Sequence, residues 1–236
     1  LGLDRGLARA SKSKVLASRP SIAQAIIEAT ASSKVKVAGR AKMLGVDTVA
    51  GARRTTTTFR NRLTTFTSTI GRMHQLRDMG VNTVQMTRTA GVPMIMYGCE
   101  VFGVSDSALD TVRSRVANGA STSTAGKNAV LTLTAIDGEA GTLDPSFEAH
   151  VGPVKHWALC VWGSWFPVNV LQDTLTAAKA KVAAAAGSPW SAANGPTTAL
   201  CVTLTRLGWS MVDYCTLVND LGSSVHLKLD SPMAVA

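Results

Sequence analysis

Lysine and arginine are the residues whose number and placement point most directly to chemistry. Residues 1–90 contain sixteen Lys and Arg against four Asp and Glu, a net charge of +12. Residues 91–236 contain eight against eleven, a net charge of −3. A basic half joined to a mildly acidic half favours a polyanionic partner for the first half. A basic face that is only hydrated by solvent would have the same composition, so charge alone leaves both interpretations open.

The spacing of the other ionisable residues forms no catalytic motif. The chain lacks the nucleophile elbow of serine hydrolases, the glycine fingerprint of dinucleotide-binding folds and the HExxH zinc motif. Asp106 and Asp110 are four residues apart, but they fall in the expected first turn of a helix, where the helix dipole favours acids without catalysis. Asp137 and Glu139 lie in a glycine-flanked turn to which we assign no metal.

Cysteine and histidine are scattered rather than clustered. No two cysteines form a CxxC pair, and no group of cysteine and histidine has zinc-site spacing. A disulfide framework is not expected at this density, so we expect buried free thiols and no metal or other cofactor. The residues concerned are Cys99, Cys160, Cys201, Cys215, His74, His150, His156 and His226.

Composition sets the fold class. Hydrophobic residues make up 46% of the 236 residues, enough for a core, and aromatic residues only 5%. No stretch reaches about 18 uninterrupted apolar residues, so we expect no membrane span and no membrane partner. There is no signal-peptide pattern, and the start at Leu1 suggests a fragment or processed product. These features favour an α+β protein that is mainly helical.

The N-terminal patterns predict a small sheet with one helix. A short strand is expected over Lys12–Leu16 and a helix over Ser21–Ala31. Alternation in Lys34–Val46 predicts a β-hairpin that turns at Gly39, and residues 48–58 read as a loop. We therefore expect the helix to pack on a two- to three-stranded antiparallel sheet.

From Phe59 the apolar residues recur at helical spacing. A second helix over Val81–Ala90 is expected to end at the breaker Gly91-Val92-Pro93, and an amphipathic helix is expected over Ser105–Val116. We predict a helical bundle over Phe59–Val116 with Tyr97 at or near its packed interface. The apolar series comprises Phe59, Leu63, Phe66, Ile70 and Met73.

Residues 119–128 read as a linker and residues 129–236 as a second helical region. Helices are expected over Val170–Ala186, Thr197–Leu207 and Asp213–Leu221. Trp157, Trp162 and Trp165 are expected to fill a second core, although tryptophans can also stack on bases.

Two segments near the N-terminus resemble the region that follows the active site in reverse transcriptases of non-LTR-type retroelements. Leu7–Leu16 is similar to a family segment of the form l-x-l-n-x-x-K-T-x-v-l, with Lys12 and Ser13 on its Lys-Thr pair. Val37–Val46 is similar to the primer-grip hairpin, with a methionine in place of the usual aromatic residue. The triplet of that hairpin falls on Met43, Leu44 and Gly45.

A third segment, Arg88–Phe102, resembles the thumb motif v-x-P-x-x-x-Y-G-x-E-x-w of the same family. Together the three segments cover roughly the first half of the chain. The resemblance implies a palm remnant over 1–58, a thumb-like bundle over 59–118, the linker over 119–128 and a C-terminal extension over 129–236. The positions that match the thumb motif are Pro93, Tyr97, Gly98 and Glu100.

The resemblance implies a fragment of an RNA-directed DNA polymerase that grips RNA/DNA primer-template through phosphates. The paired aspartates of the polymerase palm would precede residue 1, so Mg²⁺ is implied only for that missing site and the segment alone is expected not to polymerise. Lys12 would lie near the nucleotide phosphates and is the one possible catalytic assist. Gly45 would allow close approach to a primer. The expected phosphate contacts are Lys12, Lys14, Arg40, Lys42, Arg53, Arg54, Arg60 and Arg62.

Two other functions remain open. A basic helical scaffold or protein-interaction domain would have no nucleic-acid role, and its binding would resist salt. A small-molecule enzyme would need a pocket near the tryptophans with convergent polar groups, for which His150 and His156 are the hints.

Overall fold

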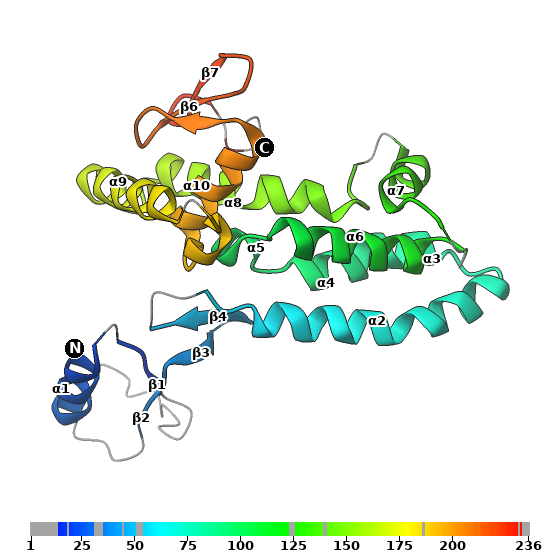
Figure 1. Cartoon of the computed structure of the whole chain (residues 1–236), viewed down its shortest axis with the longest axis horizontal. Coiled ribbons are helices and arrows are strands. Elements are labelled where there is room, and N and C mark those ends of the chain that lie inside the picture. The colour runs from blue at the N-terminus through cyan, green and yellow to red at the C-terminus, as the bar shows by residue number, and fades with distance from the viewer. Residues whose placement is uncertain are drawn as a thin grey trace, which may run out of the picture.

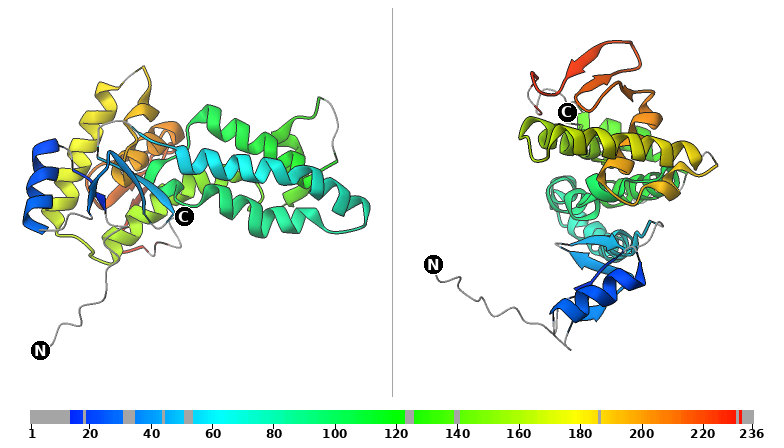
Figure 2. Two further views of the ribbon diagram at one scale, coloured as in Figure 1. Left: turned by 90° about the horizontal axis from the view of Figure 1, so that it is seen from below. Right: turned by 90° about the vertical axis from the view of Figure 1, so that its left-hand side faces the viewer.

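The computed structural model describes residues 14–17, 19–30, 35–43, 45–50, 54–122, 126–138, 141–185, 187–230 and 232. The fold is α+β and mainly helical, as the sequence predicts, with short two- and three-stranded sheets. The elements stack in chain order, from the N-terminal strands through the helical layers to the last sheet (Figures 1 and 2).

The N-terminal region contains two separate strand pairs. Strand β1 (Lys14–Val15) pairs in parallel with β2 (Lys36–Val37), and helix α1 (Pro20–Thr30) connects them. The antiparallel hairpin consists of β3 (Arg40–Met43) and β4 (Val46–Val49).

The predicted hairpin over Lys34–Val46 was therefore wrong in register. Its first strand pairs with β1, and the turn lies at Gly45 instead of Gly39. Gly45 has φ +85°, the left-handed backbone that a tight turn needs, and Gly39 is not in that region. Thr48 and Val49 belong to β4, so the predicted loop over 48–58 is shorter than expected.

Helix α2 (Thr57–Asp78) begins the helical layers and is followed by a helix that does not break where expected. The chain runs through α3 (Thr83–Met86), a π-helical turn η2 (Thr87–Gly91) and α4 (Val92–Met96). The prediction that Gly91-Val92-Pro93 ends a helix was wrong. The wide π-helical turn places Pro93 in the first turn of α4, where a missing N–H is tolerated.

The first core forms between α2, α4, α5 (Cys99–Phe102) and α6 (Asp106–Ala120). Phe59 and Phe66 are buried, which confirms the apolar series of α2. Gly91 and Gly119 lie against the Phe66 ring. A Cβ atom on Gly91 would be 2.6 Å from that ring, and one on Gly119 would be 3.0 Å from it. Tyr97 follows the last residue of α4, and 52% of its surface is exposed, so it lies outside the buried core of this bundle.

The second core lies between α8 (Pro145–Trp162), α9 (Val168–Ala184) and α10 (Pro196–Leu207) and is covered by the last sheet. Gly208, in the left-handed conformation, closes α10 as a C-cap. The elements are α7 (Ala129–Asp137), α8 (Pro145–Trp162), α9 (Val168–Ala184), the 3₁₀ turn η4 (Pro189–Ala192), α10 (Pro196–Leu207), β5 (Ser210–Met211), β6 (Thr216–Val218) and β7 (Ser224–His226).

Two predictions for this region were wrong. Asp213–Leu221 is not a helix, because the Asp213 carboxylate accepts the N–H groups of Cys215 and Thr216 and forms a turn into β6. Trp157 packs in the second core as predicted, but Trp162 and Trp165 are about half exposed, since α8 ends at Trp162.

All four cysteines are buried and free, as the sequence predicts. Burial raises the pKa of the Cys201 thiol to about 11, and burial also raises the pKa of Cys99. Such thiols are protonated and unreactive at neutral pH.

Candidate nucleic-acid interface

The turn of the β3–β4 hairpin rests directly on the chain between α4 and α5. A Cβ on Gly45 would lie 2.9 Å from Arg62 Nη2 and 3.2 Å from Tyr97 Cε1. A Cβ on Gly98 would lie 2.6 Å from a methyl group of Val46. The absence of side chains at the two glycines therefore lets the hairpin and the Tyr97–Gly98 segment touch.

Arg62 of α2 joins these two segments. Its Nη2 donates to the Gly45 carbonyl at 2.6 Å and its Nη1 to the Tyr97 carbonyl at 2.5 Å. Its guanidinium carbon also lies 5.0 Å from the centre of the Tyr97 ring. Arg62, expected as a phosphate contact, thus supports the hairpin from inside.

The hairpin is also fixed to the start of α2. The two Asp47 carboxylate oxygens accept the Thr58 backbone N–H at 2.7 Å and the Thr58 hydroxyl at 2.6 Å. A carboxylate at this end of a helix is favoured by the helix dipole. Arg40 donates to the Thr57 hydroxyl at 2.8 Å. The orientation of the hairpin relative to α2 is therefore set by polar contacts at both of its strands.

Four of the predicted phosphate-contact residues are exposed. Arg40 and Lys42 are two residues apart on β3 and share a face, and Arg60 lies on the first turns of α2. Lys42 is opposite Asp47 in the ladder, but that carboxylate is bonded to Thr58. Lys14 on β1 is exposed as well. Within the described ranges, none of the four forms an ion pair.

Arg54 behaves differently from these exposed cations. Its Nη2 donates to the Gly103 carbonyl at 2.5 Å, and its guanidinium lies 5.6 Å from the centre of the Trp190 ring. Burial, followed by the charges of Arg206 and Arg60, lowers the pKa of Arg54 to about 10. Arg54 is still cationic at neutral pH, and its hydrogen bond fixes the segment between α5 and α6.

Lys12, Leu44 and Arg53 lie outside the described residues, together with Ser13 and the start of the first predicted strand. Met43 is the last residue of β3.

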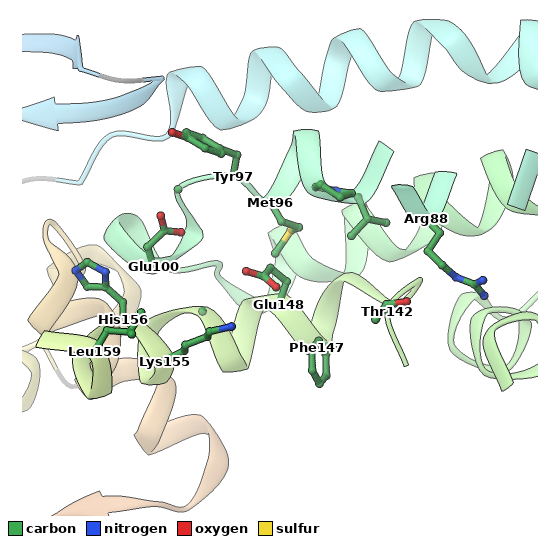
Figure 3. A pocket seen from close by; sticks show the side chains of 14 residues that line it. Arg88, Met96, Tyr97, Glu100, Thr142, Phe147, Glu148, Lys155, His156 and Leu159 are labelled. Carbon is green, nitrogen blue, oxygen red and sulfur yellow. The ribbon is translucent and has the colours of Figure 1, made fainter. Parts of the chain in front are cut away.

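A cavity of about 560 Å³ lies behind Tyr97, and all four positions of the thumb-like motif line it. Figure 3 shows Tyr97 and Glu100 on one side and side chains of α8 on the other. The α8 residues are Glu148, Lys155 and His156, with Leu159 and Phe147 adding apolar surface. Sequence reasoning named His156 but missed Glu148 and Lys155, although their spacing of seven places them on one helix face.

The two glutamates of the cavity repel one another. Burial, and then the nearby Glu100 carboxylate, raises the pKa of Glu148, and Lys155 partly opposes this. His150 does not join them: its Nε2 lies 3.3 Å from Arg206, and burial and that cation lower its pKa. The carboxylate pair is suited to binding a cation or exchanging a proton.

In the described part of the chain, no three His, Cys, Asp or Glu side chains gather as metal ligands would. No helix found there combines the length and apolar character needed to cross a bilayer. The comparisons found no match to this chain among family models, curated proteins or solved structures.

Proposed function

We propose that this chain is the region that follows the active site of a reverse transcriptase of the retroelement type, and that it grips primer-template nucleic acid through phosphates. One observation carries the proposal: the hairpin with the primer-grip pattern rests by Gly45 on Tyr97–Gly98 of the segment with the thumb pattern. A hairpin held in this way is a rigid support for the cations that it presents.

The physical basis for binding is the set of exposed cations around the hairpin. Arg40, Lys42 and Arg60 are exposed, and no described acidic side chain pairs with them. Phosphate contacts position a protein on a nucleic acid without reading its sequence. If these three residues and Lys14 each meet one phosphate, log K against log salt should have a slope of about −3 to −4.

The test compares two double variants with the same loss of charge. Lys42→Ala with Arg60→Ala removes two of the proposed contacts. Arg72→Ala with Arg115→Ala removes two exposed arginines elsewhere on α2 and α6. Fluorescence anisotropy with a primed duplex at several salt concentrations should show weaker binding and a slope flatter by about 2 for the first pair only.

Equal effects of the two pairs would mean that binding follows net charge alone, and no binding at low salt would remove the proposal. Binding of a protein partner that resists salt would favour the scaffold alternative. Arg54 and Arg62 are left unchanged because they bond backbone carbonyls.

A second candidate function is the binding of a small organic cation in the cavity behind Tyr97. It is favoured by the convergence of Glu100 and Glu148 beside apolar side chains. Spermidine is a suitable probe, because it joins ammonium groups by apolar spacers. It should raise the melting temperature of the wild type more than that of Glu148→Gln. An equal rise in both proteins would exclude this site.

A further inference from the structure

A second cavity, of about 820 Å³, lies where the starts of α2 and α6 meet η4. Two arginines line it, Arg54 from the segment that enters α2 and Arg60 from the first turns of α2. Phe59, Leu63 and Trp190 supply its apolar wall. Six hydroxyl side chains also line it: Thr56, Ser105, Ser107, Thr111, Ser188 and Ser191.

The charge around this cavity is unbalanced. Arg54 is close enough to Arg60 and Arg206 for both charges to oppose its own. Of the described residues that line the cavity, Asp106 is the only acid, and it pairs with Arg206 Nε at 2.8 Å. The lining therefore keeps an excess of positive charge that a bound anion would neutralise.

The groups in the lining select the kind of anion. Guanidinium groups and hydroxyls all donate hydrogen bonds. Phosphate is a compact anion whose ionised oxygens accept hydrogen bonds, so it matches this lining. Two cations lie over the Trp190 ring, with Arg206 at 4.3 Å and Arg54 at 5.6 Å from the ring centre. Trp190 therefore packs against the guanidinium groups of both arginines.

We propose that this cavity binds a phosphate group. This site extends the proposed function, because the phosphate would be a backbone phosphate of the bound nucleic acid. Only this source of the phosphate rests on the proposed function. The cavity lies next to the hairpin, because Arg40 contacts Thr57, the neighbour of the lining residue Thr56. A phosphate there joins α2 and α6 from outside the first core.

The test places a carboxylate in the cavity without weakening the helix. Ser107 is in the first turn of α6, where an acidic side chain favours helix formation. Ser107→Asp therefore folds while it repels phosphate. Ser114→Asp is the matched control, with the same charge change at an exposed site on the same helix.

The first measurement is the melting temperature with increasing inorganic phosphate, at ionic strength held constant with chloride. A ligand that binds only the folded state raises it. Phosphate should raise the melting temperature of the wild type and of Ser114→Asp by several degrees and leave Ser107→Asp unchanged. The same rise in all three proteins, or none in the wild type, would overturn the site.

The second measurement separates the two sources of phosphate. If a backbone phosphate fills the cavity, Ser107→Asp should weaken duplex binding about three- to tenfold more than Ser114→Asp. Equal duplex binding by the two variants, with phosphate stabilisation kept in Ser114→Asp only, would overturn the backbone source. Lys42 does not line this cavity, whereas Arg60 does, so the single variant Lys42→Ala tests the hairpin alone. Loss of duplex binding in Lys42→Ala and loss of phosphate stabilisation in Ser107→Asp are therefore independent results.

Discussion

The N-terminal strands and the first helical layer differ sharply in how they are held. Among the described residues up to 50, Ala23 alone is buried, and α1 leaves Ile22 and Ile26 exposed by 44% and 39%. The layer around α2 instead buries Phe59 and Phe66 in a continuous core.

The two regions are therefore held by different kinds of interaction. The hairpin has its place because of a few directed contacts at Gly45, Asp47 and Arg62. The helical layer has its place because of buried apolar area, which stabilises in proportion to its size. Mutations in the two regions should therefore fail in different ways.

The largest effect is expected in the helical layer. Phe66→Ala would leave a cavity beside Gly91 and Gly119 and should lower the free energy of unfolding by about 3 to 5 kcal/mol. Ile22→Ala on the exposed face of α1 should change it by less than about 1 kcal/mol. Urea unfolding measures both. Similar losses would show that the N-terminal region has a core of its own.

The next effect concerns the contacts that hold the hairpin. Arg62→Ala removes two charge-assisted hydrogen bonds, to the Gly45 and Tyr97 carbonyls, and should cost about 2 to 3 kcal/mol. Amide hydrogen exchange should show loss of protection over residues 40–49 while the centre of α2 stays protected. Arg72→Ala, exposed on the same helix, is the control. Unchanged exchange in the hairpin would contradict the role of Arg62.

A pair of glycines isolates the contact between Gly98 and Val46. Gly98 and Gly80 have nearly equal φ angles, +87° and +86°, but only a Cβ on Gly98 would meet another atom, at 2.6 Å. Gly80→Ala measures backbone strain alone. Gly98→Ala should cost about 2 kcal/mol more, because it also displaces Val46. Equal losses of unfolding free energy in the two variants would mean that the hairpin moves away from residue 98 at no energetic cost.

The smallest effect is electrostatic and lies in the helical layers. Asp144 accepts Arg113 Nη2 at 2.5 Å and caps α8 through the Ser146 N–H. Burial alone would raise the pKa of Asp144, but these hydrogen bonds lower it. The ionised Asp144 therefore stabilises the folded protein fully above the pKa of this carboxyl in the unfolded chain, about 4. This stabilisation is lost as the pH falls through the lower pKa of the folded state.

Asp144→Asn keeps the helix cap but removes the charge. It should be less stable than the wild type by about 1 kcal/mol at pH 7, since solvent screens a partly exposed pair. The difference should vanish at acidic pH. Asp173→Asn, at an exposed site on α9, is the control for the loss of one carboxylate, and urea unfolding at several pH values measures both variants.

Much of the helical part could be predicted from sequence. The apolar series from Phe59 predicted the buried face of α2, and α10 ends at Leu207, the last residue of the helix predicted there. These features depend on residues close together in the chain. The predicted register of the hairpin was wrong because Gly39 and Gly45 both suit a turn locally. The parallel pairing of β2 with β1 decided between them.

The candidate site was predicted less completely. The pattern around Tyr97 was found in the sequence, but its contact with Gly45 required the folded chain. Glu148 and Lys155 were missed, because nothing near them in the sequence indicates that α8 lies opposite Glu100.

The sequence by itself determined the charge asymmetry, the helical periods and the mainly helical α+β class, because each depends on composition or on neighbours along one element. Only the tertiary structure decided which arginines face solvent. Arg60 and Arg62 are two residues apart on α2, yet Arg60 is exposed and Arg62 bonds two carbonyls from other segments. The physical reason is that an arginine forms hydrogen bonds within the protein only where the fold places carbonyl groups from distant segments within reach of its guanidinium group.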